Sequence, residues 1–279
     1  MTRTTADLVV PARTGFGAML REWRRLRGAS QLELALTCGL SQKHLSFLES
    51  GRSRPSRGMV LHLASALRVP LAQQNALLLA AGFAPAFRSR EPQAPEMQPV
   101  ERALAHVLAQ QEPFPAIVVD DIYDIRRTNR ATGALLAWLL GAAPPANALP
   151  NAIELVLRPD GLRPHLENWS EVALWLVRRL RAQALHEGAH GRTRELLARV
   201  LALPDVAEVA RVPMQEPEPG PTLVLRLRKD DVRLGLFSMI ATFGTPLDPT
   251  LQDLRLEFFF PVDQASERWF RARAAAAPA

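Results

Sequence analysis

Apolar residues recur at helical spacing through the first third of the chain. Met19, Leu20, Trp23 and Leu26 lie three or four residues apart, with polar residues between them. The same spacing returns in four further groups, at residues 32–38, 45–48, 60–67 and 71–79. Residues so spaced share one face of an α-helix. The pattern therefore predicts five short helices that bury their apolar faces against one another.

The rest of the chain mixes helical and alternating patterns. A helix is predicted at residues 100–110, short strands at 116–120 and 122–128, and an interrupted helical stretch from 130 to about 203. Three strands follow: apolar residues alternate at 223–228, residues 232–243 are apolar on both faces and should be central, and residues 254–260 come last. Asp230 and Asp231 predict a tight turn between the first two. The pattern indicates an α+β domain, with an antiparallel sheet of about five strands and helices on one face, of the PAS or GAF kind.

A proline-rich and polar segment separates the two patterns. Prolines remove backbone donors and interrupt helices, and they are frequent between Phe83 and Pro99. We therefore predict an all-α five-helix head at residues 12–84, a linker at 85–99 and the α+β domain at 100–275. The 279 residues, 48% of them hydrophobic, suffice for two cores.

Charge is distributed unevenly between the two parts. Residues 1–90 hold 13 Lys and Arg against four acids, a net charge of +9, whereas the remainder holds 21 against 24, a net charge of −3. A basic head favours a polyanionic partner such as nucleic acid, although a solvated basic face without a partner is an alternative. No apolar stretch is long enough to cross a bilayer, and the single cysteine, Cys38, suits a reducing compartment. We expect a cytoplasmic protein with no membrane partner.

The segment from Gln31 to Gly51 has the pattern of a helix-turn-helix. Gly39 supplies a left-handed turn, Leu40 enters the core, and Ser41 caps a new helix. Leu45 and Leu48 point inward on this second helix, which leaves four side chains directed outward: Gln42, Lys43, His44 and Phe47. Gln42 is suited to adenine, Lys43 to guanine or phosphate, and Phe47 to a thymine methyl group.

Each of these residues also has a structural interpretation. Gln42 is alternatively a solvated residue of the first helical turn, and Phe47 a core residue. Glu49 is expected to be structural, because DNA repels a carboxylate that has no internal partner. Arg24, Arg25 and Arg27 are alternatively a solvated helix face.

The head resembles the XRE (Cro/cI-like) helix-turn-helix regulators. The likeness covers about 65 residues and rests on Gln31, on the sequence Gly39-Leu40-Ser41 and on Glu49-Ser50-Gly51. It implies that Gln31 and Gln42 form a pair at the DNA, with Ser46 and the arginines after the helix near phosphates. Family members often carry a small residue or arginine in place of His44. The candidate DNA-binding residues are Gln31, Ser41, Gln42, Lys43, His44, Ser46, Phe47, Arg52, Arg54 and Arg57.

The second domain resembles the ligand-binding domain of MmyB-like regulators, a PAS-like module. The likeness rests on PFPAIVVDDIYDI (residues 113–125), PDGLRPHLENW (159–169) and FGTPLDPTLQDLRLEFFFPVD (243–263). It implies a lipophilic, fatty-acid-like effector between the sheet and its helices. The candidate ligand-binding residues are Trp169, Trp175, Phe237, Met239 and Phe258 as apolar walls, with Arg163 and Asn168 as polar partners. As alternatives, these are ordinary core residues, or the domain serves only for dimerisation or recruits another protein, which would make the chain a DNA-binding scaffold.

One motif suggests an enzyme. The sequence HEGAH contains His186, Glu187 and His190 in the H-E-x-x-H spacing of zinc hydrolases. Gly188 and Gly191 indicate that the helix ends there, which would prevent the two histidines from aligning. The chain also lacks a G-x-x-x-x-G-K phosphate loop and a G-x-S-x-G elbow. We therefore expect no catalytic activity, no metal and no cofactor.

The sequence as a whole predicts a homodimeric, ligand-responsive regulator that binds a pseudo-palindromic double-stranded DNA operator. The alternatives are the scaffold and, remotely, the zinc hydrolase.

Overall fold

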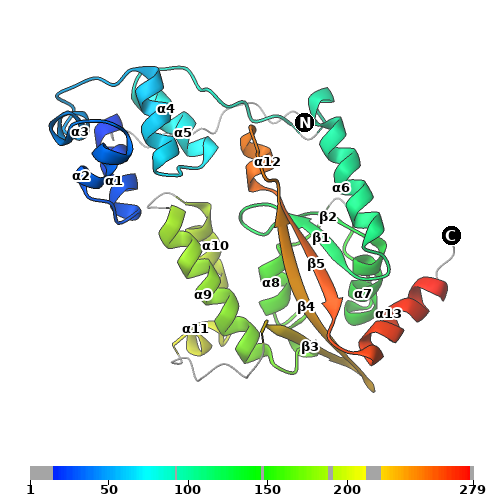
Figure 1. Ribbon diagram of the computed structural model, residues 1–279. Helices are drawn as coiled ribbons and strands as arrows, with labels where there is room; N and C mark the ends of the chain where they lie inside the picture. Colours follow the sequence, from blue (N-terminus) through cyan, green and yellow to red (C-terminus); the bar gives the residue numbers. More distant parts are fainter. Residues whose placement is uncertain (1–14, 92, 146–147, 188–190, 212–220, 277–279) are drawn as a thin grey trace. The chain divides into compact units, whose positions relative to one another are not determined.

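The structure is a computed structural model that describes residues 15–91, 93–145, 148–187, 191–211 and 221–276 (Figure 1). These residues form two compact units: the first runs to Ser89 and includes Leu247–Pro249, and the second comprises Arg90–Pro246 and the residues from Thr250 onward.

The first unit contains the five helices that the hydrophobic pattern predicts. They are α1 (Phe16–Leu26), α2 (Gln31–Thr37), α3 (Gln42–Glu49), α4 (Arg57–Ala66) and α5 (Leu71–Ala80). Leu20, Leu45, Leu63 and Leu77 have no exposed surface and form the centre of the core. Each such leucine contributes about 1.5–3 kcal/mol by burial. The unit is therefore stabilised mainly by the apolar faces that define the pattern.

Serine caps and left-handed glycines set the ends of α2 and α3. The Ser30 hydroxyl accepts a hydrogen bond from the Glu33 backbone, and the Glu33 carboxylate accepts one from the Ser30 backbone. The Ser41 Oγ accepts the His44 N–H at 3.1 Å, which starts α3. Gly39, between the two helices, has a φ of +63°, where a side chain would be strained. The predicted helix-turn-helix geometry is therefore confirmed at the level of its caps and turn.

The second unit alternates helices with strands. It contains α6 (Gln98–Gln110), β1 (Ala116–Val119), β2 (Ile125–Thr128), α7 (Arg130–Leu140), α8 (Ala152–Leu157), α9 (Trp169–Glu187), α10 (Arg192–Leu201), α11 (Val206–Val209), β3 (Val224–Lys229), β4 (Val232–Thr242), α12 (Pro249–Asp253), β5 (Arg255–Pro261) and α13 (Gln264–Ala276). Two short 3-10 turns, η1 (Pro95–Met97) and η2 (Arg163–His165), precede α6 and α9.

The strands of the described chain form one antiparallel sheet in the order β2-β1-β5-β4-β3. The predicted turn after β3 is confirmed: Lys229 pairs with Val232, and Asp230 has a φ of +52°. Strand β4 is interior, as its apolar pattern predicts, while β5 takes the middle position. Two segments far apart in the sequence, β1 and β5, therefore lie side by side.

Helices cover both faces of this sheet (Figure 1). Ile117 and Val119 of β1 face a core that includes Ile153 of α8 and Val177 of α9. The alternate residue Val118 faces the other way, in a core with Leu104 of α6. The prediction of helices on one face only is wrong, because the apolar stripe of α6 needs a surface of its own and finds it on the opposite side of β1.

Candidate DNA-binding surface and ligand cavity

Helix α3 exposes polar residues at its N-terminal end and buries its apolar face. Ser41, Gln42 and Lys43 are exposed, whereas Leu45 and Leu48 have no exposed surface. The remaining predicted DNA-binding residues of this helix, His44, Ser46 and Phe47, are half-buried. Arg52 and Arg54 in the following loop, and Arg57 at the start of α4, are exposed. The exposed residues of this set lie at the start of α3 and just after its end, and they are accessible to a phosphate backbone or a base edge.

The ring of Phe47 lies near two cations. The Lys43 Nζ is 5.8 Å from the ring centroid and the Arg52 guanidinium carbon is 5.9 Å from it. Cation–π attraction of this kind holds a cation near an aromatic face. Phe47 is therefore more than a core residue, because it also positions two of the predicted DNA-binding side chains.

Gln31 has a structural partner within the first unit. Its Nε2 donates a 2.8 Å hydrogen bond to the Glu49 carboxylate, which lies at the end of α3. Gln42 makes no hydrogen bond with any residue that the structure describes, so the pair of Gln31 and Gln42 expected at the DNA is not preformed. Ser41 likewise acts as the cap of α3.

Glu49 is the centre of a buried ion cluster, which confirms its predicted structural role. Its carboxylate has no exposed surface and accepts hydrogen bonds from the Arg24 Nε and Nη2 at 2.5 and 3.0 Å. The Arg21 Nε lies 3.5 Å away. Burial acts to raise the pKa of Glu49, but hydrogen bonds from Arg24 and Gln31 and the nearby arginine charges outweigh burial and hold the pKa below its usual value.

The sequence interpretation of the α1 arginines needs a correction. Arg24 is 9% exposed and Arg27 donates through Nε to the Leu67 carbonyl at 2.9 Å, so neither belongs to a freely solvated face. Gly17 contributes to the same packing, because a Cβ there would lie 2.5 Å from the Leu48 carbonyl oxygen. Helices α1 and α3 therefore approach closely enough for Arg24 to reach Glu49. The helical spacing alone did not reveal this contact.

The second unit contains a cavity of about 650 Å³ between one face of the sheet and helices α8 and α9. Its apolar walls include Ile117, Ile240 and Phe259 from the sheet, Val156 from α8, and Leu176 from α9. This volume is within the range of about 300–1,000 Å³ that small-molecule sites occupy. The cavity is large enough for a mainly aliphatic ligand.

A few polar groups face the same cavity. Arg178 and Arg179 line it from α9, and Glu257 lines it from β5. Tyr123 also lines it, and its ring centroid lies 5.0 Å from the guanidinium carbon of Arg179 and 5.4 Å from that of Arg255. An apolar cavity with a small number of polar groups is typical of a ligand site.

Among the predicted ligand-binding residues, Trp175 alone lines the cavity. Phe237, Met239 and Phe258 lie on the opposite face of the sheet, since Met239 pairs with Phe258 while the cavity residue Ile240 pairs with Glu257. The sequence analysis chose strands that line this cavity but residues on their other face. Successive strand residues point to opposite sides, and both sides of β4 and β5 are apolar enough to suit a core.

The remaining three predicted ligand residues hold the fold together. Asn168 donates to the Val224 carbonyl at 2.8 Å and accepts from the Arg226 N–H at 3.1 Å, so it completes the edge of β3. The Arg163 guanidinium stacks 4.0 Å from the Trp169 ring centroid and pairs with Asp205. None of the three lines the cavity, and Trp169 packs against the neighbouring apolar cores while its buried Nε1 has no hydrogen-bond partner among the described residues.

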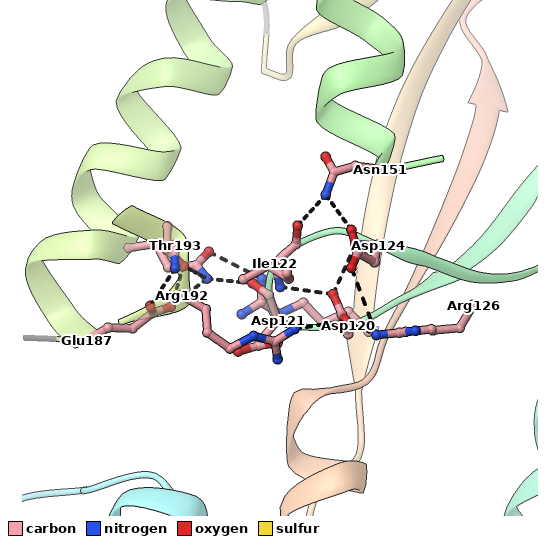
Figure 2. A network of polar contacts seen from close by, with 11 residues as sticks. Asp120, Asp121, Ile122, Asp124, Arg126, Asn151, Glu187, Arg192 and Thr193 are labelled. Carbon is pink, nitrogen blue, oxygen red and sulfur yellow. Dashed lines mark hydrogen bonds and ion pairs between the residues drawn. The ribbon is translucent and has the colours of Figure 1, made fainter. Parts of the chain in front are cut away.

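A polar network holds the loop that carries Tyr123 (Figure 2). The Asp120 Oδ1 accepts the Ile122 and Asp124 N–H groups at 3.0 and 2.9 Å, and Asn151 donates to the Ile122 carbonyl at 2.6 Å. Tyr123 has a φ of +64°, which is unusual for a residue with a side chain. The sequence analysis missed this loop, although the run of acids in DDIYD was the available signal.

Glu187 of the zinc motif has another role in the described chain (Figure 2). Glu187 accepts hydrogen bonds from the Thr193 Oγ1 at 2.6 Å and the Thr193 N–H at 3.3 Å, which caps the start of α10. The His186 Nδ1 lies 2.7 Å from the Ala182 carbonyl oxygen. His190 is outside the described residues, and the residues described include no group of three side chains arranged to hold a metal ion.

Within the ranges described, no helix combines the length and apolar character needed to cross a membrane.

Comparison with known proteins assigns both units. Residues 100–272 match the MmyB-like transcription regulator ligand binding domain, and residues 20–74 match a helix-turn-helix family. No curated protein matches the chain. A solved structure titled "Structure of an RNA-binding Light-Oxygen-Voltage Receptor" is similar at 12% identity with a TM-score of 0.28, covering 93% of this chain and 64% of that chain.

The match to the ligand-binding domain extends over more than half of the 279 residues. It includes every residue that lines the cavity, from Ile117 to Phe259. The helix-turn-helix match includes α2 and α3 in full. Together they place a helix-turn-helix and a transcription regulator's ligand-binding domain in one chain. The chain therefore belongs to the family that carries the MmyB-like transcription regulator ligand binding domain.

Proposed function

We propose that the protein is an XRE-type regulator that binds a specific operator as a homodimer and responds to a lipophilic effector in the cavity beside α9. The observation that carries this proposal is the pairing of two features in one chain. A capped helix exposes Gln42 and Lys43 while its apolar face is buried, and a separate unit contains an apolar cavity of about 650 Å³.

The proposed DNA contacts divide into two kinds. Gln42 and Lys43, at the start of α3, read base edges in the major groove, where glutamine pairs with adenine and lysine with guanine. Phe47 contacts a thymine methyl group while its ring holds Lys43 and Arg52. Arg52, Arg54 and Arg57 contact phosphates, which adds affinity for every sequence alike. Gln31, Ser41, His44 and Ser46 support the helix and the neighbouring phosphate contacts.

A helix as short as α3 reads only a few base pairs, so a second copy is needed for a specific operator. Helix α3 has eight residues, and its fully exposed residues are Gln42 and Lys43 at its start. In helix-turn-helix dimers the two reading helices enter successive major grooves about 34 Å apart. We therefore propose a homodimer on a pseudo-palindromic site.

The proposed effector is a lipophilic molecule with an acidic end, such as a medium-chain fatty acid. Apolar residues from the sheet, α8 and α9 supply most of the cavity wall, and each buried methylene of a ligand contributes about 0.8 kcal/mol. Arg178 and Arg179 supply positive charge at the cavity for a carboxylate. We also propose that the chain is not an enzyme, because the one catalytic motif uses its glutamate as a helix cap.

The experiment that tests this proposal measures binding of the purified protein to its own upstream DNA and to random DNA across a salt series. Each series is repeated with decanoic acid. We expect tighter binding to the upstream DNA, a steep loss of affinity for both DNAs with salt, and a change in the specific affinity when decanoic acid is present. Equal affinity for both DNAs would contradict sequence-specific recognition, and unchanged affinity with decanoic acid bound would contradict effector control.

A further inference from the structure

One carboxylate stands in the apolar wall of the cavity. Glu257 occupies the middle of β5, the central strand, and its cross-strand neighbours are Ile117 of β1 and Ile240 of β4. All three residues line the cavity. Side chains opposite each other in an antiparallel pair lie about 4.5–5.5 Å apart. An isoleucine therefore flanks the Glu257 carboxylate on each side.

Glu257 has no partner among the residues that the structure describes. No hydrogen bond or ion pair reaches its carboxylate, although other acids near the cavity are paired, such as Asp120 with Arg126 and Glu154 with Arg199. A polar group that is partly removed from water destabilises a fold unless something donates a hydrogen bond to it. The carboxylate is therefore open to a donor that enters the cavity.

The fold itself gives no reason for a glutamate at this position. Central strands favour β-branched and aromatic residues, and both neighbours of Glu257 are isoleucine. The residue caps no helix, closes no turn and bridges no strands through its side chain. A structural role would be served better by an apolar residue, so the carboxylate is more readily explained by what it binds.

The charges of the cavity set the chemistry of that ligand. Arg178 and Arg179 on α9 suit an acidic end group, whereas Glu257 repels one. A plain fatty acid would satisfy the arginines and the apolar wall but would leave Glu257 without a donor. The missing element is a hydrogen-bond donor carried on the apolar body of the ligand.

We propose that the natural effector is an amphiphile whose otherwise apolar body carries a hydrogen-bond donor, a hydroxyl or an amide N–H, that Glu257 accepts. This inference rests on the proposed function, since it names the ligand class of the same cavity. It goes further in giving the cavity a means of distinguishing hydroxylated or amide-linked acyl chains from simple ones. Such discrimination is strong, because a site built to receive a donor is left unsatisfied when the donor is missing.

The test uses the full chain and four probes of similar length. These are decanoic acid, beta-hydroxydecanoic acid, omega-hydroxydecanoic acid and N-octanoylglycine, so that the donor is absent, near the acid, at the far end, or an amide N–H. Dissociation constants are measured by calorimetry for the wild type, Glu257→Leu, Glu257→Gln and the control Glu195→Leu. Glu195 is an exposed acid on α10 that does not line the cavity, so its replacement removes the same charge elsewhere.

We expect at least one donor-bearing probe to bind the wild type about tenfold or more tightly than decanoic acid, as a hydrogen bond to a charged acceptor allows. Glu257→Leu should reverse this order and bind decanoic acid more tightly than the wild type does. Glu257→Gln should keep part of the preference, since its amide oxygen still accepts, and Glu195→Leu should behave as the wild type.

Folding is checked independently of ligand binding. Glu257→Leu should unfold at the same or a higher temperature than the wild type, because it replaces an unpartnered carboxylate with an apolar side chain between two isoleucines. This measurement separates an altered cavity from an unfolded protein.

Two results would overturn the inference while leaving the lipophilic effector in place. One is equal affinity of the wild type for decanoic acid and all donor-bearing probes. The other is a donor preference that persists in Glu257→Leu. Failure of every probe to bind the wild type and Glu257→Leu would overturn both the inference and the proposed effector class.

Discussion

Glu49 and Gln42 lie on the same helix, yet replacing Glu49 should affect stability and replacing Gln42 should affect DNA recognition. Glu49 is fully buried and holds Arg24 and Gln31, whereas Gln42 is exposed and contacts no described residue through a hydrogen bond. Stability of the first unit depends on the former, and recognition of DNA is assigned to the latter. The two effects can therefore be measured separately.

Replacing Glu49 should destabilise the first unit strongly. Glu49→Ala leaves the guanidinium of Arg24 buried without its partner, and loss of one member of a buried pair costs about 3–5 kcal/mol. Chemical denaturation would measure the loss. The double replacement Arg24→Met with Glu49→Leu should recover most of it, because no charge then remains buried. If the double variant were as unstable as the single one, charge pairing would not be the cause.

The stability of the same unit should depend on acid. The pKa of Glu49 is lower in the folded protein than its ordinary value of 4.5, so its ionised form is favoured by folding. Its contribution is therefore present above about pH 4.5 and is lost as the pH falls through the folded pKa. Unfolding curves of the wild type should show this loss below about pH 4.5. Curves of the double variant should be flatter there.

Gln42→Ala should relax the choice of DNA sequence. We expect a loss of about 1–3 kcal/mol for the specific site and little change for random DNA, because a base contact is removed. Arg52→Ala should instead weaken both DNAs and reduce the slope of affinity with salt, because a phosphate contact is removed. Fluorescence anisotropy across a salt series measures both. Equal losses on the two DNAs for Gln42→Ala would exclude its role in base reading.

At the scale of helices and strands, the sequence predicted the ends of helices better than it predicted which face of a strand lines the cavity. Ser30, Gly39 and Ser41 revealed the ends of α2 and α3, because caps and left-handed turns are determined within a few residues. The face of β4 that lines the cavity was not predictable from its own sequence, since Phe237 and Ile240 are equally apolar. That choice depends on where α6 and α9 pack.

Asn168 should matter for the edge of the sheet and not for the ligand. Asn168→Ala removes two hydrogen bonds to β3 and is expected to lower the stability of the second unit by about 1–3 kcal/mol. Its effect on binding of decanoic acid should be small, because Asn168 does not line the cavity. Thermal unfolding and calorimetry measure the two quantities. A large loss of affinity with unchanged stability would restore Asn168 as a ligand residue.

The end of α12 should make the second unit sensitive to alkali. Burial and the nearby carboxylate of Asp121 raise the pKa of Asp253 to about 7, from 3.8, against the opposing charge of Arg192. A raised folded pKa contributes stability that is complete below pH 3.8 and is lost as the pH rises through about 7. Asp253→Asn should therefore raise the melting temperature at about pH 8 and have little effect at acid pH. An unchanged difference between the two proteins across this range would contradict the assignment.

For the whole molecule, effector control requires that cavity and reading helix influence each other in both directions. If decanoic acid changes the affinity for the operator by some factor, the operator must change the affinity for decanoic acid by the same factor. Calorimetry with and without operator DNA measures the second factor, and DNA titrations measure the first. Unequal factors would show that the two measurements do not report on one equilibrium.

Successive side chains of β5 face the cavity and the layer of α6 in turn, and this arrangement bears on how a bound effector could act. Glu257 and Phe259 face the cavity, while Leu256 and Phe258 face the layer of α6, the first long helix after the linker. Ile117 of β1 also lines the cavity while Val118 faces the layer of α6, so β1 and β5 together separate the ligand from that helix within the described sheet. Affinity and efficacy therefore need not follow each other: a slender ligand that fills the cavity without displacing β5 would bind tightly and act as an antagonist, whereas a bulkier one of equal affinity would act as an agonist.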